Sequence, residues 1–340
     1  MAIDQTRRVS VIVPVYNGGW CLEQCLEGIR RSSYRDYELI VVDNGSTDNS
    51  VAIAQASGAL VAHCPGPSGP GAARNTGVAH AAGAIVVFVD ADVVVHEDVF
   101  ARMVERFVED SKLAAVFGSY DDRPAALNFL SQYKNLLHHY VHQQGSRQAT
   151  TFWGGCGAVR KDIFLNVGGF DQQKYPTPSI EDIELGDRIH RQGYRICLDR
   201  DIQATHLKEW RLVSLLRAEI FYRAIPWSRL ILERQGLVND LNLKMSQRAS
   251  AGVAGLFLAT LPLTPIFPVL TVGCLALLSL FLFLNRGLFA FFLRRRGLVF
   301  SAMTVPMHGL YFIYSGVTFV LMWASYVWEG RRGAAAIGRE

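Results

Sequence analysis

The sequence predicts an α/β fold with a mostly parallel sheet over residues 1–205, followed by a helical region of different composition. Two observations carry this prediction. Short, continuously apolar and β-branched runs alternate with helical patterns in the first part of the chain. After residue 205 the composition changes, first to a basic and aromatic segment and then to two long stretches without charged residues.

The apolar runs of the first part have the pattern of strands buried on both faces, and helical patterns separate them. We expect strands at 9–15, 38–42, 60–63, 84–89 and 195–198, and helices at 21–31, 48–57 and 72–82. Alternation of this kind implies right-handed crossovers, so most strands run parallel. Ligands bind at the carboxyl ends of such strands, where Asn17, Asp43 and Asp90 are found.

Residues 206–249 combine regularly spaced arginines with large apolar side chains. This composition predicts amphipathic helices that lie on an anionic membrane surface. The alternative is an ordinary solvated helix packed on the core. The membrane interpretation is favoured because the segment leads directly into an apolar stretch.

Residues 250–330 form a predicted transmembrane region. Both charge-free stretches, 251–284 and 298–328, exceed the about 20 residues that a spanning helix needs. Prolines near the middle of the first stretch predict a turn there, and arginines flank both stretches. Because the positive-inside rule places those arginines in the cytoplasm, we expect two hairpins. The protein would be multi-pass in the cytoplasmic membrane, with residues 1–205 in the cytoplasm, where unpaired cysteines are stable.

The segment Asp90-Ala91-Asp92 follows a predicted buried strand. Two carboxylates at a strand end suit a divalent cation that also binds phosphate oxygens. The alternative is a pair of solvated loop acids, so the surrounding motifs decide the interpretation.

Those motifs resemble the family 2 glycosyltransferases in order and spacing. They are residues 9–17 (VSVIVPVYN), 41–50 (VVDNGSTDNS), 71–77 (GAARNTG), 87–93 (VFVDADV), 154–171 (GGCGAVRKDIFLNVGGFD), 180–193 (IEDIELGDRIHRQG) and 205–206 (TH). The resemblance covers roughly residues 8–210. It implies a GT-A fold, a nucleoside-diphosphate sugar donor and inversion at the anomeric carbon.

The resemblance also implies the donor site. Tyr16 would pack against the base, Asp43 would hydrogen-bond a uracil-type base, and Asp90 would bind the ribose. Arg74 would lie near the base and diphosphate. The nucleotide-binding positions that match are Pro14, Tyr16, Asn17, Asp43, Ser46, Arg74 and Asp90.

Asp92 and His206 match the family's metal site, which implies Mn²⁺ or Mg²⁺ as cofactor. The alternative for His206, expected in a loop after the strand at 195–198, is a hydrogen-bonded loop histidine. Glu181 and Asp182 match the family's E-D pair. Inversion needs a base that takes the acceptor hydroxyl proton, and we assign that role to Asp182, with Glu181 orienting it or the acceptor. The alternative is that both acids stabilise a helix N-terminus.

The acceptor pocket is expected at Trp153, Gly154 and Gly155, where glycines let the backbone approach a sugar and an aromatic face can stack on it. A core tryptophan beside a tight turn is the alternative. The processive synthases of this family carry Q-x-x-R-W, which residues 223–227 (RAIPW) do not match. This departure favours transfer of a single sugar.

The favoured function is transfer from a UDP-sugar to a hydroxyl of a lipid-linked or glycolipid acceptor at the membrane, with no nucleic-acid partner. A polyprenyl-phosphate sugar synthase is the nearest alternative, because such enzymes resemble the first half of the chain. A catalytically silent GT-A membrane scaffold is an alternative of another class. The sequence leaves the sugar, the acceptor and the oligomeric state open.

Overall fold

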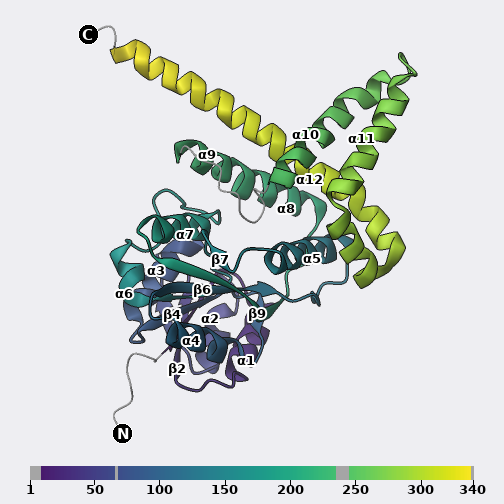
Figure 1. Ribbon diagram of the computed structural model, residues 1–340. Coiled ribbons are helices and arrows are strands. Elements are labelled where there is room, and N and C mark those ends of the chain that lie inside the picture. Colours follow the sequence, from purple (N-terminus) through teal and green to yellow (C-terminus); the bar gives the residue numbers. More distant parts are fainter. Residues whose placement is uncertain (1–8, 66–67, 235–244, 338–340) are drawn as a thin grey trace. The chain divides into compact units, whose positions relative to one another are not determined.

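The computed structural model describes residues 9–65, 68–234 and 245–337 of the 340, with side chains up to Glu329. The chain divides into two compact units, Met1–Trp210 and Arg211–Glu340 (Figure 1). The division falls a few residues after the expected boundary at residue 205.

The N-terminal unit is built on a nine-stranded mixed sheet with the strand order β3-β2-β1-β4-β8-β6-β9-β5, in which β7 pairs with β9. The strands are β1 (Val9–Val15), β2 (Tyr37–Asp43), β3 (Leu60–His63), β4 (Ile85–Val89), β5 (Val93–Val95), β6 (Leu113–Tyr120), β7 (Gln148–Ala149), β8 (Cys156–Arg160) and β9 (Arg195–His206). The first four confirm the expected strands, and they pair in parallel.

Helices connect these strands and cover the sheet (Figure 1). They are α1 (Leu22–Arg30), α2 (Ser50–Ala56), α3 (Pro70–His80), α4 (Val99–Glu109), α5 (Phe129–Gln143), α6 (Lys161–Asn166) and α7 (Glu181–Arg191). The three expected helices are confirmed as α1, α2 and α3. Helix α3 begins two residues early because Pro70 occupies its first turn, where the missing N–H costs no hydrogen bond.

The second half of the sheet contains antiparallel pairs that the sequence did not predict. Strand β8 pairs antiparallel with both β4 and β6, and β9 pairs antiparallel with β5. The strand expected at 195–198 continues to His206, which therefore ends a strand and does not follow a loop. Gly118 permits this extension, because a Cβ there would lie 2.3 Å from the carbonyl oxygen of Ile202.

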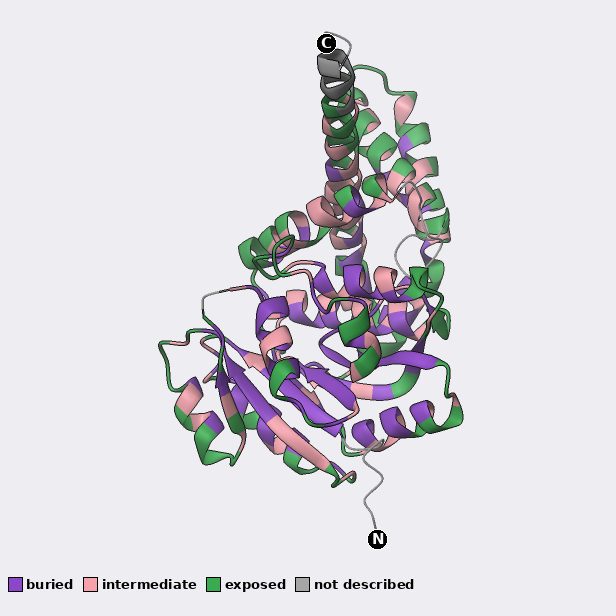
Figure 2. Cartoon of the chain, turned by 90° about the vertical axis from the view of Figure 1, so that its left-hand side faces the viewer, coloured by how far each residue is buried: buried purple, intermediate pink, exposed green. Residues whose placement is uncertain are grey.

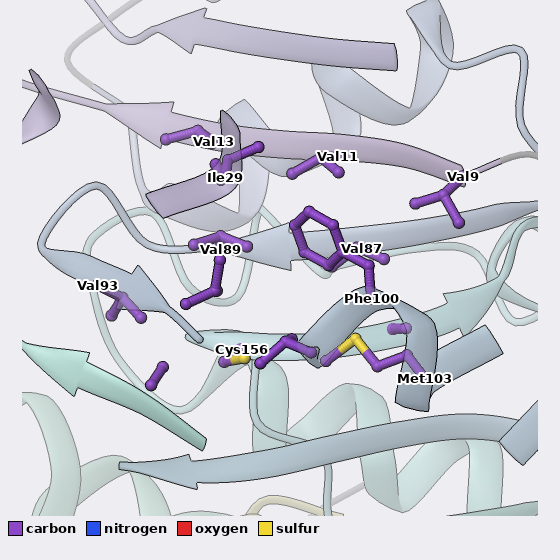
Figure 3. Packing of buried hydrophobic residues seen from close by; sticks show 14 of the residues in the cluster. Val9, Val11, Val13, Ile29, Val87, Val89, Val93, Phe100, Met103 and Cys156 are labelled. Carbon is purple, nitrogen blue, oxygen red and sulfur yellow. The ribbon is translucent and has the colours of Figure 1, made fainter. Parts of the chain in front are cut away.

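The core lies between the sheet and its helices. Val11 of β1 and Val87 of β4 face Phe100 and Met103 of α4, and Ile29 of α1 closes the same cluster (Figure 3). All five are essentially inaccessible to solvent. Each such side chain contributes about 1.5–3 kcal/mol on burial. The strand ends that carry the polar residues are thus attached to a rigid platform.

The C-terminal unit is helical, and many of its residues are exposed or half-exposed (Figure 2). Its elements are α8 (Leu212–Arg217), the π-helical η2 (Ala218–Ala224), α9 (Ile225–Glu233), α10 (Met245–Thr260), the 3₁₀ turn η4 (Leu261–Leu263), α11 (Leu270–Leu284) and α12 (Arg286–Ile337). The expected amphipathic segment 206–249 includes residues 235–244, which lie outside the described residues.

The two apolar stretches fold differently. Residues 251–284 lie in α10 and α11, joined by a turn that contains Pro262, Pro265 and Pro268. Residues 298–328, expected to form a second hairpin, lie in one continuous helix, the part of α12 after Gly297. One proline, Pro306, does not break that helix, and the non-helical residue Gly297 marks a kink before the stretch. Among the described residues, Arg286–Glu329 is the one helix long and apolar enough to cross a membrane.

Candidate active site

The pairing of β5 with β9 sets the position of the predicted metal ligands. Asp90 and Asp92 lie in the turn between β4 and β5, and Val93 of β5 is opposite His206 of β9. Because the strands are antiparallel neighbours, the turn approaches the end of β9. His206 Nε2 consequently lies 3.6 Å from Asp92 Oδ2.

Asp92 and His206 have the chemistry that a divalent cation requires. Burial alone would raise the pKa of Asp92, but the neighbouring His206 imidazole holds that pKa below its ordinary value, so the carboxylate is ionised. No group of three metal-binding side chains is found in the described part of the chain. Two protein ligands suit a cation that takes its remaining ligands from phosphate and water. The residues present therefore fit Mn²⁺ or Mg²⁺ bound together with a diphosphate.

Arg74 lies at the centre of an ion network in which Arg74 and Glu181 are buried and the Asp90 side chain is 34% exposed. Its Nη2 donates to Asp90 Oδ1 at 2.6 Å, and its Nη1 donates to Glu181 Oε1 at 2.9 Å. The arginine is 3% exposed, and its Nε has no hydrogen-bond partner among the described residues. Both carboxylates raise the pKa of Arg74 against the effect of burial, so it stays charged. The guanidinium expected near the nucleotide thus joins Asp90, the predicted ribose ligand, to the acid pair on α7.

Asp182 lies in the first turn of α7, next to Glu181. Its Oδ2 accepts a hydrogen bond from the Gly154 N–H at 2.9 Å, and its Oδ1 accepts one from the Ile183 N–H. Burial, followed by the charge of Glu181, raises the pKa of Asp182 to about 6. A carboxylate with this pKa is ionised at neutral pH and accepts a proton more readily than an ordinary aspartate.

The Gly154-Gly155 turn has little space for side chains. A Cβ on Gly154 would lie 3.2 Å from Arg74 Cζ, and a Cβ on Gly155 would lie 2.7 Å from the Trp153 ring. The carbonyl oxygen of Gly155 accepts a hydrogen bond from the Asp90 N–H. The glycines predicted for the acceptor pocket therefore connect the turn of Asp90 with the first turn of α7, and Trp153 lies against them.

The remaining predicted nucleotide residues form an interlocked pair of loops after β1 and β2. The Asn17 N–H donates to Ser46 Oγ, and the Ser46 N–H donates to Asp43 Oδ1, both at 3.0 Å. Burial opposes ionisation of Asp43, but hydrogen bonds, first from Ser46, hold its pKa below the ordinary value. Tyr16 is 52% exposed beside these loops. Its ring is therefore accessible to a base.

The loop after β1 also lies beside the aspartate turn. A Cβ on Gly18 would be 3.6 Å from the Cβ of Ala91, which lies between Asp90 and Asp92. Pro14 lies one residue before the end of β1 and so immediately precedes this loop. The predicted nucleotide residues consequently gather along one edge of the sheet, next to the predicted metal ligands.

An aromatic cluster behind His206 was not predicted. Tyr120, the last residue of β6, stacks on the His206 ring with centroids 4.2 Å apart and planes 14° apart. On its other sides Tyr120 meets His138 of α5 and Trp153. His142, one turn after His138, donates through its Nδ1–H to the Gly118 carbonyl oxygen at 3.0 Å, and burial lowers the pKa of His142 to about 4. The i, i+4 spacing of the two histidines was the available signal, because it places both on one helix face.

Comparisons with known proteins identify relatives of the N-terminal unit. Residues 10–168 match the family model described as Glycosyl transferase family 2. The glycosyltransferase GlyG of Streptococcus pneumoniae is 35% identical over 117 residues, which are 33% of this chain and 38% of that protein. The poly-beta-1,6-N-acetyl-D-glucosamine synthase of Staphylococcus aureus is 26% identical over 236 residues, 67% of this chain and 55% of the synthase. The chain thus spans about half or less of the length of these relatives.

A solved structure extends the comparison to the fold. The mannosyltransferase PcManGT from Pyrobaculum calidifontis is 22% identical with a TM-score of 0.51, and the match covers 94% of this chain and 89% of that one. At this identity the similarity concerns the fold alone. Together with the family match, it shows that the N-terminal unit contains a family 2 glycosyltransferase domain with the GT-A fold.

Proposed function

We propose that the chain is an inverting glycosyltransferase that moves one sugar from a UDP-sugar to a hydroxyl of a lipid-linked or glycolipid acceptor at a membrane surface. The observation that carries the proposal is the partly buried network that links Asp90 through Arg74 to Glu181. It holds a donor-side carboxylate and an acceptor-side acid pair in one rigid assembly. A silent scaffold would have no need of such a costly buried assembly.

The donor part of the proposal rests on the loops after β1 and β2. The exposed ring of Tyr16 offers a stacking surface for a base, and the Asp43 carboxylate is kept ionised by the neighbouring loop. PcManGT was solved with GDP-Man and Mn²⁺, which supports a nucleoside-diphosphate sugar in the wider family. The preference for uracil is the narrower part of the proposal and depends on Asp43.

Asp92 and His206 are proposed to hold Mn²⁺ or Mg²⁺. A bound divalent cation would neutralise the charge that develops on the departing diphosphate. Asp92 supplies an ionised oxygen, and the stacked ring of Tyr120 limits how the His206 imidazole can turn. The protein thereby holds two ligands in place before the nucleotide arrives.

The transfer step is proposed to depend on Asp182. The acceptor oxygen attacks the anomeric carbon, a new C–O bond forms, and the bond to the diphosphate breaks with UDP as leaving group. The hydroxyl proton passes to the Asp182 carboxylate, which is suited to accept it because burial raises its pKa to about 6. Glu181 is held by Arg74 and supplies the neighbouring charge. Trp153 and the two glycines beside it are proposed to line the pocket for the acceptor sugar.

Association with a membrane is proposed for the C-terminal unit. Of the 18 consecutive residues that are most apolar within Arg286–Glu329, 11% are buried inside the structure. The core helix of a soluble protein would be mostly buried. The regularly spaced arginines of residues 211–234 suit anionic lipid headgroups. We propose the cytoplasmic face of the membrane, where nucleotide sugars are available to the catalytic unit.

The test is a donor screen with the full-length chain. Purified protein in lipid nanodiscs would be given UDP- and GDP-sugars with Mn²⁺ and a bacterial lipid extract, and labelled lipids would be identified by mass spectrometry. We expect one UDP-sugar to give a glycosidic product that resists mild acid, and the Asp182→Asn chain to give none. An acid-labile sugar phosphoester would indicate a polyprenyl-phosphate sugar synthase, and the absence of transfer from every donor would support a scaffold.

A further inference from the structure

Several backbone polar groups in the turn between α10 and α11 are hydrogen-bonded within the turn or are absent. Residues 261–269, here called the hairpin tip, contain Pro262, Pro265 and Pro268, which have no N–H to satisfy. The N–H groups of Thr264 and Phe267 donate to the carbonyls of Leu261 and Leu263, at 3.2 and 2.9 Å. Ile266 N donates to Leu263 as well, at 3.1 Å, and Thr264 Oγ1 bonds the Leu261 carbonyl. Hydrocarbon tolerates backbone only when its polar groups are satisfied internally.

The side chains of the hairpin tip are apolar and exposed. Ile266 is 67% exposed and Val269 is 77% exposed, and the large side chains of Leu261, Leu263 and Phe267 are exposed as well. The tip has no charged residue. A contiguous apolar surface of this kind is rarely left in water.

The opposite end of the hairpin is polar. Asn285, which follows α11, donates through Nδ2 to Ser250 Oγ of α10 at 3.0 Å. Its Oδ1 lies 3.3 Å from Nε2 of His308 on α12. Arg248 precedes the charge-free stretch, and Arg286 follows it. Both ends of the hairpin are therefore fixed together beside charged residues, while the tip offers only apolar groups.

The helices of this hairpin are short for a membrane span. Helix α10 has 16 residues and α11 has 15. At a rise of about 1.5 Å per residue they are about 24 and 22 Å long, against about 30 Å for the bilayer hydrocarbon. The first part of α10 also lies on the polar side of Ser250, so less than its full length is available to enter the membrane.

We propose that α10 and α11 form a re-entrant hairpin, which enters the bilayer from the side of Arg248 and Arg286 and returns to it, with residues 261–269 held among lipid acyl chains. The inference rests on the proposed membrane association of the C-terminal unit. It makes residues 251–284 an anchor in the bilayer that exposes no loop on the opposite side. A hairpin that does span would place the tip in water there.

The test measures the accessibility of a thiol at the tip in the full-length chain. Ile266→Cys would be compared with Lys112→Cys, an exposed position in the N-terminal unit, in sealed vesicles treated with a membrane-impermeant maleimide from either side. All six native cysteines are buried, and the unchanged chain measures their background. We expect Lys112→Cys to react from one side and Ile266→Cys to react from neither until detergent is added.

The two possible failures are distinguishable. Reaction of Ile266→Cys from the side opposite to Lys112→Cys would show a spanning hairpin and overturn the inference, while membrane association would stand. Reaction from the same side would show that the hairpin lies in water, which overturns the inference and weakens the proposed anchor. Extraction of the unchanged chain by carbonate would show independently that no part of the chain is embedded in the bilayer.

A second measurement tests directly whether an unreactive thiol at the hairpin tip is surrounded by lipid acyl chains. Bimane attached in detergent to Val269→Cys, followed by reconstitution, would be exposed to lipids brominated along the acyl chains and to aqueous iodide. We expect strong quenching by the deep bromines and a several-fold weaker effect of iodide. Iodide quenching equal to that of bimane at Lys112→Cys would overturn the inference.

Discussion

Asp182 combines a half-buried position with hydrogen bonds that favour its ionised form at neutral pH. We expect Asp182→Asn to keep nucleotide binding while the transfer rate falls by about 10²–10⁴-fold, because general base catalysis contributes about that factor. Calorimetry with UDP and Mn²⁺ and a transfer assay check the two parts. Asp187→Asn in the same helix is the matched control. A transfer rate near that of the unchanged chain would remove Asp182 as the base.

The raised pKa of Asp182 also predicts a pH dependence. The active form is the carboxylate, so the transfer rate should rise with pH through about 6 and reach a plateau above it. Glu181→Gln removes the nearby negative charge that helps to raise this pKa, so the midpoint of the rise should move to lower pH. A pH profile of transfer in both chains checks the shift. A midpoint that stays in place or moves upward would contradict the assigned electrostatics.

Asp92 and His206 predict a metal-dependent part of nucleotide binding. In Asp92→Ala the Mn²⁺-dependent gain in UDP affinity should disappear, and His206→Ala should reduce it, because the cation loses one of two protein ligands. Titration with UDP, with and without Mn²⁺, separates this gain from metal-independent binding. Asp98→Ala, which replaces a half-exposed acid directly before α4, should leave this gain unchanged. An unaltered Mn²⁺-dependent gain in UDP affinity in Asp92→Ala would contradict the assignment of Asp92 as a metal ligand.

At the scale of elements, Arg74 of α3 joins the end of β4 to the first turn of α7. We expect Arg74→Ala to lower the free energy of unfolding by about 3–5 kcal/mol, because Glu181 is left buried without its cation. Urea denaturation checks the value. Arg30→Ala, which removes an exposed helix pair with Glu27, should leave the free energy of unfolding nearly unchanged, because solvent screens exposed ion pairs. Equal effects of the two substitutions would contradict a structural role for the network.

Local patterns explain which elements the sequence predicted. Continuous apolar runs such as Val9–Val15 identify strands buried on both faces, whatever their partners are. The antiparallel pairing of β8 and the extension of β9 to His206 depend on non-local contacts, including the space left by Gly118. For the same reason the sequence motifs identified Arg74, Asp90 and Glu181 as separate candidates. Only the three-dimensional structure shows that ion pairs connect these three side chains.

The hairpins illustrate the same limit in the C-terminal unit. Three closely spaced prolines made a turn between α10 and α11 predictable, since each removes a helical hydrogen bond. Charge distribution alone suggested a similar turn in residues 298–328, where the structure has one continuous helix. The positive-inside rule concerns the side of the membrane on which arginines lie, and it does not by itself bend a helix. Pro306 alone does not end the helix either.

At the scale of the whole molecule, the chain consists of two compact units that divide after Trp210. The polar chemistry described above belongs to the first unit, and the exposed apolar helices belong to the second. Such a division suits an enzyme whose donor is dissolved in water and whose acceptor is confined to a membrane, because anchoring reduces the search for the acceptor to two dimensions.

This division predicts the behaviour of truncated chains. Residues 1–210 should fold, bind UDP with Mn²⁺ and remain in the supernatant when lipid vesicles are sedimented, whereas the full chain should sediment with them. A chain of residues 1–203 provides the comparison, because it lacks the end of β9 that pairs with β5 and carries His206. It should lose both metal-dependent binding and stability. If residues 1–210 still sedimented with lipid, the N-terminal unit itself would contain a membrane-binding surface, and anchoring would not belong to the second unit alone.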